Sequence, residues 1–191
     1  KNKGVALSEE LIECIINNFN HEFDWDYLWG IKQINIDLLT IEKYKEKINW
    51  NVFSGLNNIN WSIELIDKFI DFWDWSILSS NCSINWSIEL IDKFLDYWDW
   101  TKISSNNSIN WSICLIDEFI DYWDWSKISS NNSLPINEVY KMYKEKTDLF
   151  GLSCNSSFNF SLELLKEKEN LTLNWWAISE NEKIIWDIES L

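Results

Sequence analysis

The fold is decided by the stretch NWSIELIDKFIDFWDW at residues 60–75, which recurs with few changes at residues 85–100 and 110–125. The period is 25 residues, and a repeat of this length predicts one supersecondary unit that stacks on its neighbours to bury its apolar face. Four columns extend the period beyond these copies: one is aromatic, one is aliphatic, one is apolar with a single Phe, and one is small. They are Trp25, Trp50, Trp75, Trp100, Trp125 and Phe150; Ile34, Ile59, Ile84, Ile109 and Leu134; Leu28, Phe53, Leu78, Ile103 and Ile128; and Gly30, Gly55, Ser80, Ser105 and Ser130.

The same period predicts the domain organisation. Residues 1–191 are expected to form a single repeat array of about seven units. Residues 1–25 would be a divergent first repeat, 26–150 the regular repeats, and 151–191 divergent repeats of which the last is incomplete. Weaker copies begin at 7–12, 158–164 and 185–189. Because the last copy stops early in its first helix, we expect a piece of a longer chain or an end that meets a partner.

Each unit is predicted to contain one longer and one short helix. In the first, Ile63, Ile66, Phe69, Ile70 and Trp73 lie at helical spacing on one face, after an N-cap oxygen supplied by Asn60 or Ser62. The second runs from Trp75, is capped by Asp74, and is expected to end where Asn81 takes the left-handed conformation. The fold class predicted is therefore all-α, a right-handed α-solenoid.

A leucine-rich repeat is the competing interpretation, because Leu78-Ser79-Ser80-Asn81 superficially resembles the strand of that repeat. The strand would require alternating apolar residues, and its asparagine would lie further beyond the leucine than it does here. These two departures favour the helical solenoid.

The repeat resembles tandem Trp-rich repeats of the form WDWxxLSxN…WSxELI in uncharacterised proteins of bacteria and giant viruses. The matching residues are Trp73-Asp74-Trp75, Leu78-Ser79, Asn81, Trp86-Ser87 and Glu89-Leu90-Ile91, with their copies. Those families usually place proline before the helix tryptophan, whereas this chain has asparagine there and its proline only at Pro135. The resemblance implies a repeat scaffold and no particular activity.

Nine tryptophans of the central repeats are predicted to form the structural core. They are Trp61, Trp73, Trp75, Trp86, Trp98, Trp100, Trp111, Trp123 and Trp125. Large rings bury much area in a short unit. Their alternative role is a stacking platform for bases or sugars, but platforms for single strands lie in positively charged grooves.

Exposed acidic columns are the candidate partner-binding surface. Two columns of aspartates recur on the face opposite the apolar stripe, and a column of Phe and Tyr lies beside them. These candidate residues are Asp67, Asp71, Asp92, Asp96, Asp117 and Asp121, with Phe72, Tyr97 and Tyr122 as anchors. The three rings form a secondary stripe with Leu65, Leu90 and Leu115, and this stripe is expected either to pack on the next repeat or to form a groove for a partner. A third aspartate column, beginning at Asp74, is expected to cap helices. The columns could be a solvated face that keeps the array soluble or a ridge that steers a basic partner.

Composition narrows the function classes. The 191 residues carry 16 Lys+Arg and 31 Asp+Glu, a net charge of −15, with 15 Trp, and none of the basic residues is arginine. Direct nucleic-acid binding rests on basic contacts and is not expected. No apolar run near membrane length occurs, so no membrane segment is expected.

Enzymatic chemistry is not expected either. No glycine-rich phosphate loop or DxDxDG calcium loop occurs, the single histidine His21 has no local partner for a metal or a nucleophile, and the acidic residues are repeated rather than unique. We therefore predict no catalytic residues, metal or cofactor. The four cysteines, Cys14, Cys82, Cys114 and Cys154, are far apart in sequence and are expected to be free thiols of a cytoplasmic protein.

The sequence thus favours a non-enzymatic, acidic scaffold that binds a protein with a basic surface. One alternative is an acidic inhibitor that mimics nucleic acid, because evenly spaced carboxylates can imitate a phosphate backbone. Another is an accessory or spacer region of a longer protein.

Overall fold

The computed structural model describes residues 13–14, 18, 24, 26–27, 38–161, 164–165 and 172–181. Within these residues the regular secondary structure is helical. The chain divides into two compact units, Lys1–Asn85 and Trp86–Leu191, which are described one at a time. Repeated helices with tryptophans about 25 residues apart confirm the predicted all-α solenoid.

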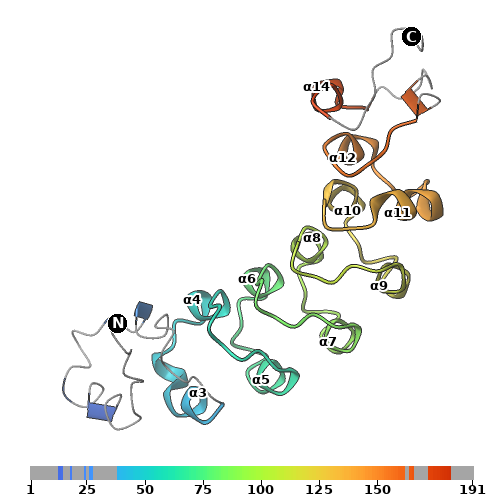
Figure 1. Ribbon diagram of the computed structural model, residues 1–191. Coiled ribbons are helices and arrows are strands. Elements are labelled where there is room, and N and C mark those ends of the chain that lie inside the picture. The colour runs from blue at the N-terminus through green and yellow to red at the C-terminus, as the bar shows by residue number, and fades with distance from the viewer. Residues whose placement is uncertain are drawn as a thin grey trace, which may run out of the picture. The chain divides into compact units, whose positions relative to one another are not determined.

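Helices of two kinds alternate along the chain (Figure 1). The first helices of successive repeats are α3 (Leu38–Tyr44), followed by the 3-10 helix η1 (Lys45–Lys47), and α5 (Ile63–Lys68) in the first unit, and α7 (Ile88–Lys93), α9 (Ile113–Glu118) and α11 (Ile136–Tyr143) in the second. The second helices are α4 (Trp50–Ser54) and α6 (Trp75–Ser79) in the first unit, and α8 (Trp100–Ser104), α10 (Trp125–Ser130), α12 (Leu149–Ser153) and α14 (Trp175–Ser179) in the second.

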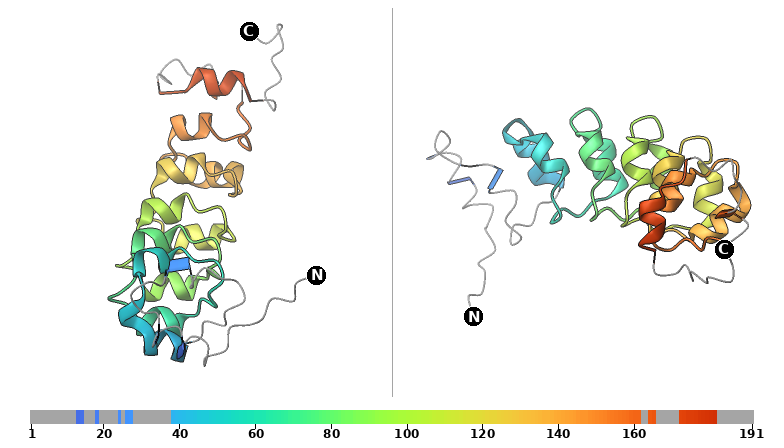
Figure 2. Two further views of the ribbon diagram at one scale, coloured as in Figure 1. Left: turned by 90° about the vertical axis from the view of Figure 1, so that its left-hand side faces the viewer. Right: turned by 90° about the horizontal axis from the view of Figure 1, so that it is seen from above.

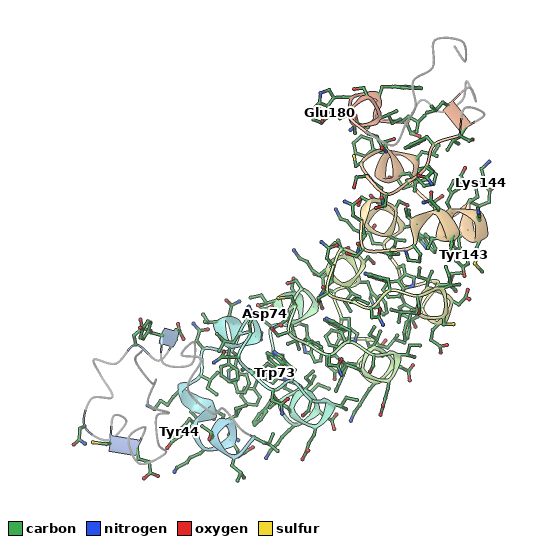
Figure 3. All side chains as sticks on the ribbon, viewed as in Figure 1. Tyr44, Trp73, Asp74, Tyr143, Lys144 and Glu180 are labelled. Atoms are coloured by element: carbon green, nitrogen blue, oxygen red, sulfur yellow. The ribbon has the colours of Figure 1, made fainter. Side chains whose placement is uncertain are left out.

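Within each unit the two kinds of helix form two layers (Figure 1). In the second unit, α8, α10, α12 and α14 stack one above the next, as the yellow-green to red helices show in the left view of Figure 2. The apolar core lies between the layers. Trp73 occupies this position in the first unit (Figure 3).

Side-chain caps begin the helices as the sequence predicts. Ser62 accepts a hydrogen bond from the backbone N–H of Leu65, 3.1 Å away, and so caps α5. Asp74 caps α6 by accepting from the N–H of Ile77 at 3.0 Å. The same pairs recur one and two periods later in α7 to α10.

The first helix is shorter than its apolar spacing predicts. The spacing continues to Trp73, but α5 ends at Lys68 and the chain turns over residues 69–72. The indole N–H of Trp73 then donates to the carbonyl oxygen of Ile66 at 3.0 Å. A helix end leaves its last carbonyls without partners, and the returning ring satisfies one of them, so the turn is stable where the sequence pattern predicted more helix.

Every tryptophan column uses its indole N–H in this way. Trp75 donates to the carbonyl of Ile70 at 3.1 Å, and Trp61 donates to the carbonyl of Leu56 at 3.2 Å. The later copies with the same geometry are Trp98, Trp100, Trp111, Trp123 and Trp125. A ring that only filled space could be Phe or Leu, so these contacts explain why Trp is used.

A buried serine joins each second helix to the next repeat. Ser104 accepts from the backbone N–H of Asp124 at 3.0 Å, and Ser129 accepts from that of Asp148 at 2.8 Å. Both serines are fully buried. In the first unit Ser54 makes the same bond to the N–H of Asp74 at 3.0 Å.

A buried asparagine ladder runs beside the serines, and it corrects one expectation. Asn81 was expected in the left-handed conformation, but no non-glycine residue of the described chain has a positive φ. Its amide instead donates to the carbonyls of Ser54 and Leu56 in the preceding repeat, at 2.9 and 3.1 Å, and its side-chain oxygen accepts from the N–H of Ser83. Asn155 repeats the pattern in the second unit. The physical reason is that burial requires every amide group to find a partner.

Two parts of the sequence interpretation concern residues that the structure does not describe. The expected copies at 7–12 and 185–189, and the position of His21, lie outside the described residues. Of the helices in the described ranges, none combines the length and the apolarity required to cross a bilayer.

Candidate interaction surface

The candidate acidic residues lie on the surface of both units. In the second unit Asp92 is the last residue but one of α7, and Asp96 lies in the turn that follows this helix. Both side chains are exposed. Asp117 and Asp121 repeat this arrangement at α9. In the first unit the corresponding exposed residues are Asp67 and Asp71. The helix thus holds one carboxylate of each pair and the following turn holds the other.

An aromatic ring lies beside each acidic pair. Phe72, Tyr97 and Tyr122 are 41%, 43% and 44% exposed. One face of Tyr122 packs on the ring of Trp100, with the centroids 4.9 Å apart, and Phe72 packs on Trp50 at the same separation. Phe72 and Tyr122 therefore each pack against a tryptophan ring while part of each ring stays exposed to solvent.

One acidic pair is engaged by the chain itself. The hydroxyl of Tyr143, on α11, donates to the carboxylate of Asp117, and the Nζ of Lys146 lies 3.3 Å from Oδ1 of Asp121. The same ammonium lies over the ring of Trp125, 6.0 Å from its centroid. The pair thus binds a hydroxyl and an ammonium side by side. Figure 3 shows Tyr143 on α11.

This contact changes the titration of Tyr143. Its hydrogen bond to Asp117, then partial burial, then the negative charge of the same carboxylate raise its pKa to about 12. In the first unit, Glu42 shows the opposite effect. Hydrogen bonds from Lys68 and Lys45, with Nζ–Oε distances of 3.1 and 3.2 Å, lower the pKa of Glu42 below its ordinary value.

The third aspartate column is structural. Besides capping α6, Asp74 accepts from the side-chain amide of Asn51 at 2.7 Å. Asp124 likewise caps α10 and accepts from the hydroxyl of Thr101 at 3.2 Å. One carboxylate oxygen therefore caps the residue's own helix, as the sequence predicts, and the other accepts a hydrogen bond from the preceding repeat.

The nine central tryptophans divide by burial. Trp61, Trp73, Trp86, Trp98, Trp111 and Trp123 are buried, and Trp75, Trp100 and Trp125 are partly buried. Trp123 packs edge-on against Trp100 and Trp111, with centroids 5.0 and 5.1 Å apart. None of these nine rings stands exposed as a stacking platform would.

Comparison of the chain with protein-family models, with curated protein sequences and with solved structures gave no match. The functional argument therefore rests on the chain's own residues.

The described residues contain no group of three or more His, Cys, Asp or Glu placed to hold a metal ion. Cys14, Cys82, Cys114 and Cys154 are free and exposed.

Sequence reasoning missed two sets of surface residues. Tyr143 and Lys146 were not singled out, although they follow the acidic pair they engage by 25 to 26 residues. The exposed aromatics Trp175 and Trp176 were missed as well.

The 25-residue spacing predicts Phe150 in the tryptophan column, which is wrong: Asp148 caps α12 as Asp124 caps α10, so Leu149 takes that column. Phe150 and Trp176 instead occupy the next position, where Ser76, Thr101 and Ser126 are small and polar.

Proposed function

We propose that this protein is a non-enzymatic helical-repeat scaffold that binds a partner protein through the acidic residues and aromatic rings of its first-helix layer. We call these residues the acidic face: Asp67, Asp71 and Phe72 in the first unit, and Asp92, Asp96, Asp117, Asp121, Tyr97 and Tyr122 in the second. The proposal includes the placement of the chain among tandem Trp-rich repeat proteins, which rests on the repeat motif.

The observation that carries the proposal is the engagement of Asp117 and Asp121 by Tyr143 and Lys146. It supports the idea that each acidic pair accepts one ammonium and one hydroxyl. In the second unit, Asp92 and Asp96 have the same spacing and exposure, and no ion pair or hydrogen bond to their carboxylates is present within the described residues. A lysine-bearing surface on a partner fits this pair.

Charge and burial set the expected strength. Exposed ion pairs contribute only about 0–1 kcal/mol each, so a single pair would not hold a partner. Repetition of the pair along the array adds contacts of the same kind. The half-exposed rings of Tyr97 and Tyr122 add apolar area, and aromatic anchors often carry much of the energy of an interface.

The test is a pull-down with the tagged chain, eluted first at low and then at high salt. The variant Asp92→Asn with Asp96→Asn is compared with Glu138→Gln with Glu145→Gln, which removes two exposed charges elsewhere. We expect a basic protein that the wild type and the control retain at low salt, that salt releases, and that the aspartate variant loses. Equal capture by both variants would contradict the proposal.

Two further arms separate the alternatives. Duplex DNA added as competitor should leave a scaffold's partner bound, whereas it would remove the partner of a nucleic-acid mimic. Tyr97→Ala with Tyr122→Ala tests the aromatic anchors, since a partner held by them survives high salt and is lost from this variant. Capture of no protein under any condition would overturn the scaffold and favour a spacer.

A further inference from the structure

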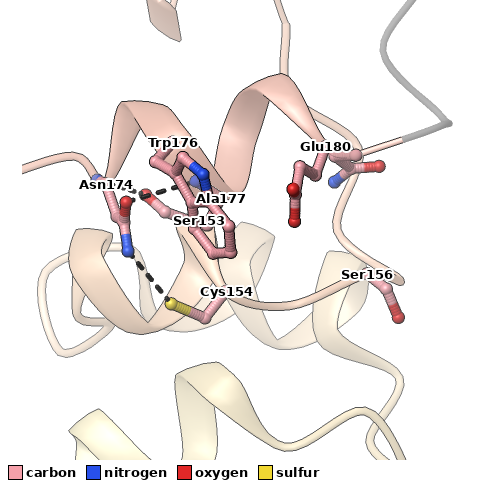
Figure 4. Close-up of a pocket in the computed structure, with 8 residues that line it drawn as sticks. Ser153, Cys154, Ser156, Asn174, Trp176, Ala177 and Glu180 are labelled. Carbon is pink, nitrogen blue, oxygen red and sulfur yellow. Dashed lines mark hydrogen bonds between the residues drawn. The ribbon is translucent and has the colours of Figure 1, made fainter.

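A pocket of about 310 Å³ opens between α12 and α14, in the second-helix layer of the second unit (Figure 4). It lies among second helices, whereas the acidic face lies on first helices and the turns after them. Its volume is at the lower end of the range of about 300–1,000 Å³ found for small-molecule sites. Residues of α12 and the loop after it form one wall, and α14 with its C-cap forms the other.

The repeat sequence explains why the pocket exists here. The third residue of the second helix varies most in size, and it is Val52, Ile77, Lys102, Lys127, Gly151 and Ala177 in turn. Ile77 and Gly151 lie against the second helix that precedes theirs. Ile77 fills the space between α6 and the end of α4, because its Cγ2 lies 3.3 Å from where a Cβ on Gly55 would be. At α12, Gly151 allows close approach to α10, since a Cβ there would lie 2.8 Å from the carbonyl oxygen of Ser126. Ala177 is too small to fill the space between the helices as Ile77 does, and it lines the pocket.

Two side chains of α14 define the chemistry of the pocket. Trp176 and Glu180 are four residues apart, so they lie on one face of the helix, and both line the pocket. Figure 4 shows them projecting from α14 toward Cys154. Trp176 is 70% exposed, and Glu180 is exposed too. The remaining lining residues are Ser153, Cys154, Ser156, Asn174, Ala177 and Asn181.

The charge of the lining selects a cation. Among the described lining residues, Glu180 carries the one formal charge, and no lysine is present to receive an anion. Within the described residues the Glu180 carboxylate has no ion pair or side-chain hydrogen bond. An ammonium group over the face of a tryptophan is attracted by the ring, most strongly among the aromatic side chains.

Elsewhere in the second unit, a carboxylate and an indole ring already bind one ammonium group. Lys146 places its ammonium 3.3 Å from a carboxylate oxygen of Asp121 and 6.0 Å from the centroid of Trp125. An indole and a carboxylate thus bind one alkylammonium between repeats. The pocket presents the same two groups, Trp176 and Glu180, with no lysine of the described chain between them.

We propose that this pocket binds an alkylammonium group, whose methylene chain lies along Trp176 while its charge pairs with Glu180. The group is either a lysine side chain of another protein or a free organic amine. The site is independent of the acidic face, and its test reads out none of the acidic face's residues.

The experiment follows the indole N–H signals of the full-length chain labelled with ¹⁵N at tryptophan. The Trp176 signal is assigned by its loss in Trp176→Phe. The probes are N-acetyl-lysine methylamide, cadaverine, and the neutral N-acetyl-norleucine methylamide, titrated at low salt. We expect both amines to shift the Trp176 signal in a saturable way, and norleucine to leave it in place.

Two variants and their matched controls test the assignment. Glu180→Gln should weaken amine binding about fivefold, whereas Glu145→Gln, an exposed carboxylate elsewhere, should not change it. Trp176→Ala should weaken binding about tenfold, measured by isothermal titration, whereas Trp175→Phe on the same helix should not. Circular dichroism verifies that each variant is folded.

Several outcomes would overturn the proposal. Equal shifts with norleucine would show an apolar pocket, and equal losses in Glu145→Gln would show non-specific attraction to the net charge. Saturation by methyl glucoside, with no effect of the amines, would assign a sugar instead. If both amines bind, the tighter of the two identifies the source: the lysine probe indicates a partner protein, and cadaverine indicates a free amine.

Discussion

Lys127 is the third residue of α10 and is exposed, and Gly151 and Ala177 hold the same position in α12 and α14. The ladder bonds beside it hardly change. The backbone N–H groups of Asp124, Asp148 and Asn174 reach the serine of the preceding helix at 3.0, 2.8 and 3.1 Å. The size of the side chain at this position therefore varies, whereas the buried serine hydrogen bonds keep nearly the same length.

The buried columns hold the array together, and the exposed columns shape its surface. The central repeats and the C-terminal repeats share the serine and asparagine positions, which bond to backbone groups of the neighbouring repeat, and the cap positions, which bond to backbone N–H groups of their own helix. They differ at exposed positions, such as Ser126 against Trp176. A binding surface can thus change from repeat to repeat at little cost in stability.

The largest expected effect comes from the aromatic core of the central repeats. Trp123 is buried against Trp100 and Trp111, and its N–H satisfies the carbonyl of Ile116 at 3.0 Å. Trp123→Ala should lower the free energy of unfolding by about 3–5 kcal/mol, measured by urea denaturation. In the C-terminal repeats, Phe158→Ala should also cost about 3–5 kcal/mol, since Phe158 is buried as well.

Trp123→Phe separates packing from hydrogen bonding. It keeps an aromatic ring and loses the indole N–H, so we expect a loss of at least about 1 kcal/mol. A Phe variant as stable as the wild type would show that the indole N–H does not matter for the helix end.

The asparagine ladder is common to the central and the C-terminal repeats. Its loss should cause the second-largest fall in the free energy of unfolding. Asn155 is fully buried and donates to the carbonyls of Ser129 and Asn131 at 3.0 and 3.1 Å. Asn155→Ala leaves these carbonyls unsatisfied and should cost about 2–4 kcal/mol. The measurement is again urea denaturation.

Asn132→Ala is the matched control. Asn132 is exposed and accepts from the backbone N–H and hydroxyl of Ser156 at 2.9 and 3.1 Å. Because water can replace it, the cost should stay below about 1 kcal/mol. Similar losses for both substitutions would remove the distinction between ladder and surface.

A substitution at Gly151 tests the third position of the second helix, where the central and C-terminal repeats differ. A Cβ at Gly151 would lie 2.8 Å from the carbonyl oxygen of Ser126 and 2.9 Å from Cβ of Ser129. Overpacking of about 1–3 kcal/mol exceeds the gain in helix propensity of about 1 kcal/mol. Gly151→Ala should therefore lower the melting temperature, whereas Gly55→Ala, whose nearest atom is a flexible Ile77 methyl at 3.3 Å, should change it little.

The smallest effect is a pH dependence at the junction of the two regions. Asp117 raises the pKa of Tyr143 to about 12, so the folded chain holds this proton more tightly than the unfolded chain. The contribution to stability is full below about pH 10, the ordinary tyrosine value, and is lost as pH rises toward 12. In Asp117→Asn the tyrosinate absorbance of Tyr143 should appear nearer pH 10. An unchanged ultraviolet titration would contradict the hydrogen bond.

Much of this fold follows from the sequence because its causes are local. The 25-residue period, the two helices of each unit and the caps at Ser62 and Asp74 depend on residues a few positions apart. The exposure of the acidic columns follows from the same helical spacing. The helical spacing was wrong where a side chain beyond the helix folded back onto its end. The spacing through Trp73 predicts a longer helix, but its indole bonds to Ile66 and closes a turn.

The tertiary structure alone decided the roles that depend on neighbouring repeats. Asn81 has the local preferences of a left-handed helix end, yet burial against the preceding repeat makes it a bridge to Ser54, 27 residues away. Likewise, Ala177 is an ordinary helix residue in sequence, and it leaves a pocket only because α12 and α14 do not close over it. Sequence determines the unit through local geometry, whereas the contacts between units depend on how closely two backbones approach.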